Sequence, residues 1–163
     1  MCKIKDLTGA EIEIDDCLGC EINDGKLVPF GGVLYQSKQF TVTQDFELPI
    51  DGFIIISTAR HVERFTDLTQ EEQGELVVLI NKVLNILRKA NVSKEFNVIL
   101  EEKEGCHFHV WLMPRHDWMI EKFGKVIKKI QDIQEYAFEN LRTEENFEKI
   151  MQTCKLLRDK LSK

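Results

Sequence analysis

Apolar and polar residues alternate along parts of the first 120 residues with the two-residue period of a β-strand. Residues 39–44 alternate Phe and Val with Thr, which predicts a half-buried strand. Residues 53–57 form a continuous apolar, β-branched run that indicates a central strand buried on both faces. Further short strands are expected over residues 33–36, 96–100 and 106–113, the last ended by Pro114, which lacks a backbone donor. Together they predict an antiparallel sheet of about five strands.

A helical period replaces this alternation in two parts of the chain. Thr69 and Glu72 form a capping-box pattern, and Asn91 is a plausible stop, so one helix is expected over 70–90. Its apolar positions are Leu76, Ile80, Val83, Leu84 and Leu87. Residues 118–141 predict a second helix, and Thr143 is expected to cap a third. The last two helices could pack on the sheet, on each other or on a second subunit.

These elements define an α+β fold with two parts. Residues 1–118 hold the sheet and one central helix, and residues 119–163 form a C-terminal helical extension. The chain has 163 residues, the size of one ordinary domain. Its net charge of −6 argues against binding to duplex nucleic acid or to a membrane surface, where clustered Lys and Arg supply much of the affinity.

The cysteines indicate the cellular compartment of the protein. Five cysteines, and an N-terminus without the apolar core of a signal peptide, argue against a disulfide framework and favour the cytoplasm. Thiols stay reduced there, and a close pair is available for a metal or for redox chemistry. Cys17 and Cys20 have the spacing of structural zinc ligands, although two cysteines alone can also be a degenerate motif.

The stretch from Cys106 to Arg115 carries the most chemical information. On a strand, His107, His109 and Trp111 share one face, while Cys106 and the apolar residues between them point into the core. The Cα atoms of the two histidines then lie about 7 Å apart along the strand. The alternative is a polar strand face that holds two histidines by chance.

Here the sequence resembles the signature of the histidine-triad (HIT) family, in which three histidines alternate with apolar residues and Pro-Arg often follows. This chain has His107, His109 and the Pro114-Arg115 pair, but Trp111 stands at the third histidine. The Cys-x-x-Cys at Cys17 is like that of many bacterial members.

Other blocks fit the same family in order and spacing. His61 follows an apolar strand, as in the family's Gly-His block, and Asp67-Leu68 comes after it. Phe96-Asn97-Val98 resembles the strand before the signature. In two further places the chain departs from the family pattern: Phe53 replaces the first histidine of the Gly-His block, and Glu104-Gly105-Cys106 replaces the small polar phosphate loop. The resemblance ends at Arg115.

The resemblance implies a site and a reaction. His109 would attack the α-phosphorus of a nucleotide and form a covalent nucleotidyl-histidine, with His107 and Trp111 beside it. Asn97, Arg115 and the backbone at Gly105 and Cys106 would bind the substrate. Because indole cannot protonate a leaving group, Trp111 implies slower or different chemistry.

The family also implies a metal and an assembly. His61 and His107 are plausible ligands to complete a zinc site with Cys17 and Cys20, which leaves His109 for chemistry; the alternative for His61 is a surface histidine. A homodimer is expected, with the 70–90 helix as the interface, because apolar residues lie on more than one of its sides (Val77, Val78, Leu79, Ile86).

Three functions therefore remain in competition. The first is a hydrolase or nucleotidyl transferase acting on a nucleoside phosphate, a phosphoramidate or a dinucleoside polyphosphate, as a diadenosine-tetraphosphate hydrolase does. The second is a nucleotide-binding protein with weak or lost turnover. The third is a zinc-stabilised interaction module that uses residues 119–163 to bind a partner.

Overall fold

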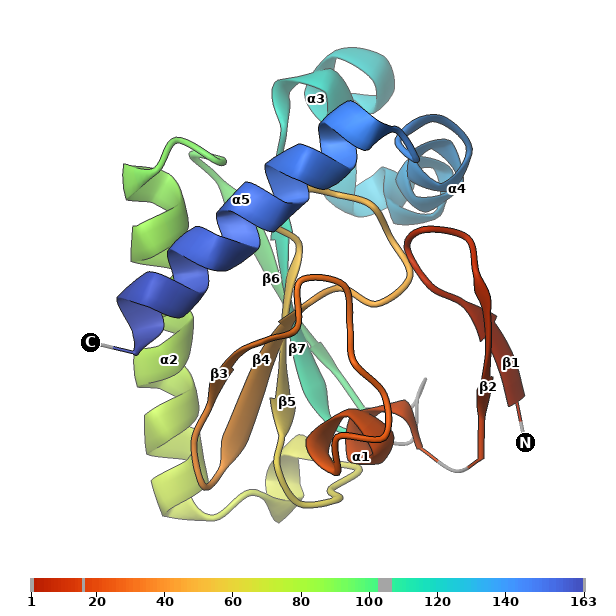
Figure 1. Cartoon of the computed structure of the whole chain (residues 1–163). Helices are drawn as coiled ribbons and strands as arrows, with labels where there is room; N and C mark the ends of the chain where they lie inside the picture. Colours follow the sequence, from red (N-terminus) through yellow and green to blue (C-terminus); the bar gives the residue numbers. More distant parts are fainter. Residues whose placement is uncertain (1, 16, 103–106, 163) are drawn as a thin grey trace.

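The computed structural model of the chain describes residues 2–15, 17–102 and 107–162. The expected α+β architecture is confirmed. Its centre is a five-stranded sheet in which every neighbouring pair is antiparallel (Figure 1). In spatial order the strands are β3 (Val33–Gln36), β4 (Phe40–Gln44), β5 (Ile54–Thr58), β7 (His109–Pro114) and β6 (Phe96–Glu101). Strand β7 ends at Pro114, as the sequence predicts.

Two long helices cover one face of the sheet. They are α2 (Gln70–Lys89) and α5 (Glu144–Leu161), which lie beside each other in Figure 1. The main core joins this face of the sheet to both helices, so the end of the C-terminal extension is part of the central fold. The core includes Val42, Ile56 and Val110 from the sheet, Leu87 from α2 and Leu157 from α5.

Helix α2 begins and ends as predicted. Thr69 and Glu72 form the capping box, and Asn91 adopts a φ of 58°, a left-handed conformation that ends a helix. The apolar surface suggested for a dimer is only partly available. Val77 and Val78 are both 67% exposed, but Leu79 is buried in the core and Ile86 packs against it.

The C-terminal extension differs from its prediction near its start. Residues 118–141 do not form one helix but are divided into α3 (Asp117–Phe123), a 3-10 turn (Val126–Lys129) and α4 (Ile130–Asn140). Gly124, with a φ of 74°, ends α3 and turns the chain. These elements enclose a second, smaller core at one end of the sheet, around Phe53, Met113 and Ile133.

The second face of the sheet is more open. The sequence predicted that the strand at 53–57 is buried on both faces, but β5 buries Ile54 and Ile56 while Ile55 and Ser57 remain half-buried. Short helix α1 (Leu18–Asn23) and a 3-10 turn (Phe65–Asp67) lie near the end of this strand. No helix in the described ranges is long and apolar enough to span a membrane.

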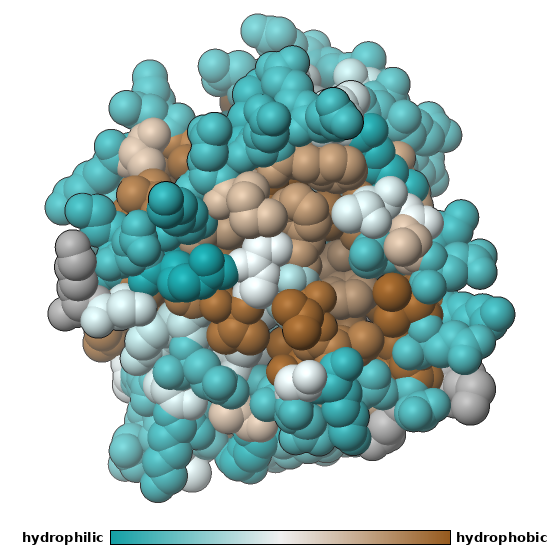
Figure 2. All heavy atoms as spheres, viewed as in Figure 1, coloured by the Kyte–Doolittle hydropathy of each residue, from teal (hydrophilic) through white to brown (hydrophobic). Residues whose placement is uncertain are grey.

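An N-terminal hairpin completes the fold. Strands β1 (Cys2–Lys5) and β2 (Glu11–Ile14) pair with each other and not with the main sheet. Its turn is nevertheless fixed, because Leu7 is fully buried and its N–H donates to the Phe46 carbonyl at 2.8 Å. Arg142, from the α4–α5 connection, donates to the Leu7 carbonyl. Hydrophobic side chains gather near the centre of the face seen in Figure 2, and hydrophilic ones form its margin.

Candidate functional site

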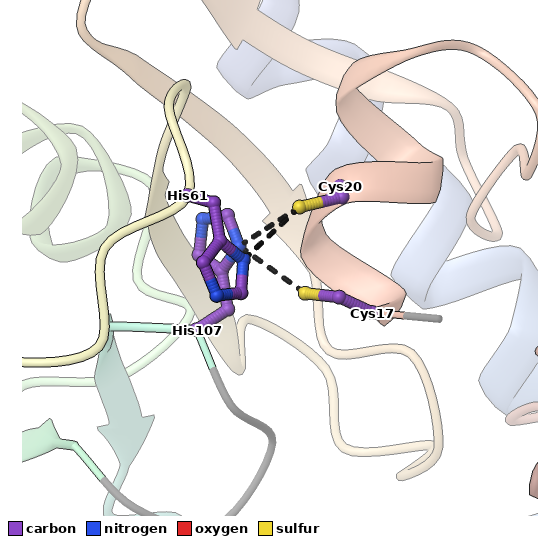
Figure 3. A group of neighbouring side chains, drawn as sticks. All are labelled: Cys17, Cys20, His61 and His107. Atoms are coloured by element: carbon purple, nitrogen blue, oxygen red, sulfur yellow. Dashed lines mark hydrogen bonds between the residues drawn. The ribbon is translucent and has the colours of Figure 1, made fainter. Parts of the chain in front are cut away.

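Four metal-ligating side chains from distant parts of the sequence converge at one end of β5. Cys17 and Cys20 come from the start of α1, His61 follows β5, and His107 precedes β7. Figure 3 shows both imidazoles facing the two thiols. One ligand atom from each residue lies within 4.8 Å of the others.

The distances suit a tetrahedral metal ion. The Nδ1 atom of His107 lies 3.3 Å from the Cys17 sulfur and 3.6 Å from the Cys20 sulfur, and the Nδ1 atom of His61 lies 3.2 Å from the Cys20 sulfur. Ordinary Zn–S and Zn–N bonds give a tetrahedral edge of about 3.6 Å between sulfur and nitrogen. Two thiols and two imidazoles are the donor set that zinc prefers, so these residues fit the metal.

The surroundings of His107 orient it toward this cluster. Its Nε2 atom donates to the Thr58 carbonyl at 2.7 Å, which leaves the Nδ1 lone pair directed at the thiols. The ring is only 4% exposed, and its pKa is lowered by burial, with the nearby His61 and His109 adding to the effect. Gly19 provides the space, since a Cβ there would lie 2.8 Å from the ring.

His109, two residues further along the strand, has different partners. Its Nδ1–H donates to the His107 carbonyl at 2.8 Å. Its Nε2 atom accepts a hydrogen bond of 2.7 Å from the indole N–H of Trp111. These two bonds place the ring proton on Nδ1 and the lone pair on Nε2. This is the tautomer in which Nε2 can act as a nucleophile.

A cleft of about 290 Å³ lies over this part of the sheet. Its floor is the open sheet face, where Ser57, His109 and Glu101 are aligned across β5, β7 and β6. Leu18 and Ile22 of α1 and Gln134 of α4 also line it, so the C-terminal extension contributes to the cleft. His107 and Trp111 line the same cleft, so the Cys-His cluster and the His109–Trp111 pair are neighbouring parts of one site.

The other end of the cleft carries acidic groups. Asp45 and Glu47 both line it, and burial raises the pKa of Asp45 to about 7 despite hydrogen bonds from the backbone N–H groups of Leu48 and Glu47. Burial also raises the pKa of Glu47. Sequence reasoning missed Asp45 and Gln134, because one is an ordinary residue at a strand end and the other lies on an ordinary amphipathic helix.

Two of the expected substrate-binding residues, Arg115 and Asn97, lie away from the cleft. Arg115 is at the far end of β7, where it forms an ion pair of 2.5 Å with Glu95. Asn97 pairs with Met113 in the sheet and does not line the cleft, and its amide nitrogen is buried without a hydrogen-bond partner. Gly105 and Cys106 lie outside the described residues.

The two aromatic residues that stand at family histidine positions are in contact. The rings of Phe53 and Trp111 pack edge to face, with centroids 5.5 Å apart. Phe53 is fully buried and Trp111 is half-buried between it and the cleft. An aromatic pair thus occupies positions where the family pattern has two histidines.

Comparison with known proteins agrees with this fold. No family model matches the chain. A HIT-like protein of Methanocaldococcus jannaschii, itself described as uncharacterized, is 25% identical over 118 residues, which are 68% of this chain and 88% of that protein. The nitrilase and fragile histidine triad fusion protein of Caenorhabditis elegans is 28% identical over 93 residues, which are 54% of this chain but only 21% of that protein.

Among solved structures, a zinc-bound histidine triad family protein from Mycobacterium smegmatis superposes with a TM-score of 0.61 at 16% identity, covering 90% of this chain and 93% of that one. The fold is therefore the histidine-triad fold. Together with the sequence similarity to a HIT-like protein, it confirms the resemblance read from the signature.

Proposed function

We propose that this protein is a nucleotide hydrolase or nucleotidyl transferase that acts at an α-phosphate through a covalent nucleotidyl-histidine on His109. One observation carries the proposal. The Nδ1–H of His109 donates to the His107 carbonyl, so the ring keeps a lone pair on Nε2, and His109 lines the cleft. A fixed tautomer makes the imidazole a ready nucleophile without a separate base.

The reaction would take place in two displacements. The Nε2 atom of His109 forms a bond to the α-phosphorus as the bond to the leaving group breaks, and the leaving group departs with the electron pair. Water then attacks the phosphorus, the bond from Nε2 to phosphorus breaks with its electron pair returning to the imidazole, and a nucleoside monophosphate leaves while a proton of the water passes to solvent. Another acceptor in place of water would instead leave with the nucleotidyl group attached to it. Each displacement is easier than a single direct attack by water.

The polar groups at the far end of the cleft support one orientation of the substrate. The carboxyl groups of Asp45 and Glu47 can form hydrogen bonds with sugar hydroxyls. The nucleoside would therefore extend from His109 toward these carboxyl groups, with the apolar side chains of Leu18 and Ile22 against it.

We further propose that Cys17, Cys20, His61 and His107 hold a structural zinc ion. The metal would join α1 to the ends of β5 and β7, and would stabilise the fold without taking part in the phosphorus chemistry. The homodimer also remains a proposal, for which the exposed Val77 and Val78 of α2 offer a surface.

The two other functions are less well supported. A binding protein without turnover is favoured by Trp111, which cannot protonate a leaving group. An interaction module built on residues 119–163 is disfavoured, because α5 buries Ile150, Cys154 and Leu157 in the main core. Those side chains are not available to a partner.

Trapping the intermediate tests this proposal. The protein is mixed with AMP- and GMP-based phosphoramidates and with dinucleoside polyphosphates, quenched in denaturant, digested and analysed by mass spectrometry. We expect a nucleotidyl group on the peptide that contains His109. Tight nucleotide binding without an adduct would support the binding protein, and neither binding nor adduct in a metal-loaded protein would support the interaction module.

A further inference from the structure

The lone pair of His109 that the reaction needs is already engaged within the protein. The indole Nε1–H of Trp111 donates to it at 2.7 Å, a normal length for a hydrogen bond. The His109 and Trp111 ring centroids lie 6.2 Å apart, with the ring planes tilted by 32°. A phosphorus atom approaching Nε2 along the lone pair would meet the indole nitrogen first.

The packing of Trp111 favours this arrangement. Its ring is half-buried and lies edge to face on Phe53, whose side chain is fully buried. Trp111 and His109 are two residues apart on one strand, which keeps their side chains on the same face. Trp111 also lines the cleft, so the indole has open space on one side.

We propose that Trp111 is a cap on the His109 nucleophile, which an incoming phosphate displaces. In the free protein the indole N–H occupies the Nε2 lone pair and keeps His109 in the reactive tautomer. When a nucleotide binds, the indole turns away from Nε2 and its N–H becomes a donor for a phosphate oxygen. This inference deepens the proposed function and rests on it for its role in catalysis, but the capped state itself does not depend on any substrate.

The cap also narrows the class of substrate. As the bond from Nε2 to phosphorus forms, the leaving group takes the electron pair of the breaking bond. Indole keeps its proton at neutral pH, so Trp111 gives none to the departing atom. A phosphoanhydride suits this site, because its leaving group departs as a phosphate anion. A phosphoramidate suits it less well, because its amine must gain a proton.

The indole N–H signals provide a direct test without nucleotide. The chain has two tryptophans, so a ¹⁵N-labelled sample gives two indole signals, which Trp118→Phe assigns. Trp118 packs against Phe123 and Tyr136 outside the cleft and serves as the internal reference. His109→Phe keeps an aromatic ring but removes the acceptor nitrogen. We expect the Trp111 indole proton to exchange with water at least about five-fold faster in this variant, the effect of losing one neutral hydrogen bond.

A second variant approaches the same bond from the other side. Trp111→Phe keeps an apolar ring on Phe53 but removes the N–H donor, which exposes the lone pair of His109. Diethyl pyrocarbonate acylates an accessible imidazole nitrogen, and peptide mass mapping reports the rate for each histidine. We expect His109 to react about five-fold faster in Trp111→Phe than in wild type. The rates for His116, and for His109 in Trp118→Phe, should not change.

The two experiments are independent: if one variant fails to fold, the other variant still tests the cap. An unchanged Trp111 exchange rate in His109→Phe, or an unchanged His109 acylation rate in Trp111→Phe, would overturn the cap. Neither experiment contains a nucleotide, so a failure to trap the nucleotidyl adduct would overturn the proposed function while leaving the cap separately tested.

Discussion

His107 and His109 are the same residue type, two positions apart near one edge of the same cleft, yet they have opposite surroundings. Both nitrogens of His107 face inward, one toward two thiols and the other onto the Thr58 carbonyl. One nitrogen of His109 donates to the backbone, and the other accepts a hydrogen bond from the indole of Trp111, which lines the cleft. The partners of each ring, more than the histidine pattern, therefore indicate what it can do.

The largest effect should follow from removing the nucleophile. His109→Ala should lower nucleotide hydrolysis by at least about 10³-fold, because no other side chain can replace a covalent nucleophile. Nucleotide binding, measured by calorimetry, should remain within a few-fold. His116→Ala is the matched control, since His116 bonds to the Asp51 carbonyl outside the cleft. Wild-type turnover in His109→Ala would exclude the covalent mechanism.

Restoring the family residue at the third position sharpens the comparison further. Trp111→His should speed the hydrolysis of substrates with poor leaving groups by about 10²-fold, because an imidazole can protonate the departing atom. Activated substrates need no proton and should change little. Rates with paired good and poor leaving groups, together with the melting temperature, check this prediction.

A different result for Trp111→His is expected if Trp111 has only a packing role. If Trp111 serves only to pack against Phe53, the change creates a cavity, costs about 3 kcal/mol of stability and lowers both rates equally. That result would place Trp111 in the core and remove it from the chemistry.

The role assigned to the inward-facing His107 depends on a bound metal. Cys17→Ser and Cys20→Ser should each lower the zinc content below about one per chain and lower the melting temperature, because structural zinc is coupled to folding. Cys154→Ala is the control. The Cys154 thiol is buried, and burial raises its pKa to about 12. This variant should be less stable than wild type but should keep its zinc. A wild-type protein that contains no metal and is unaffected by chelators would refute the zinc site.

The smallest effect concerns the acidic end of the cleft. Because burial raises the pKa of Asp45 from 3.8 to about 7, the folded protein holds a proton there that the unfolded chain has already released. The free energy of unfolding therefore falls as the pH rises through this window. Asp45→Asn should not show this loss. Relative to wild type, its free energy of unfolding should therefore increase by about 1–2 kcal/mol as the pH rises from about 4 to 8, a figure reduced because the Asp45 side chain is partly exposed to solvent.

Thermal melts at several pH values check the effect of Asp45. The same variant should bind nucleotide more weakly if the Asp45 carboxyl group accepts sugar hydroxyls. A stability difference that does not change with pH would mean that Asp45 titrates normally.

Much of the architecture could be predicted from local patterns. The sheet, the capping box at Thr69, the stop at Asn91 and the end of β7 at Pro114 all depend on neighbouring residues, which a sequence displays directly. The same is true of the faces of β7, where Val110 and Leu112 are buried and His109 and Trp111 are not fully covered. The break at Gly124 was missed because the apolar spacing continues across it.

The site was predictable only where its residues are close in sequence or part of a known pattern. The Cys17–Cys20 spacing and the family signature pointed to the cluster with His61 and His107, which the structure brings together. Arg115 and Asn97 follow the family order too, but their strand positions place them away from the cleft. The bond from Trp111 to His109 depends on side-chain orientation, which no local pattern reveals.

The division of labour between the two histidines can be tested by one measurement, the zinc content of purified His107→Ala and His109→Ala by elemental mass spectrometry. The proposal predicts that His109→Ala keeps about one zinc per chain, as wild type does, while His107→Ala loses most of it. Equal zinc loss in both variants, or full zinc content in His107→Ala, would contradict the assignment of His107 to the metal and His109 to the chemistry.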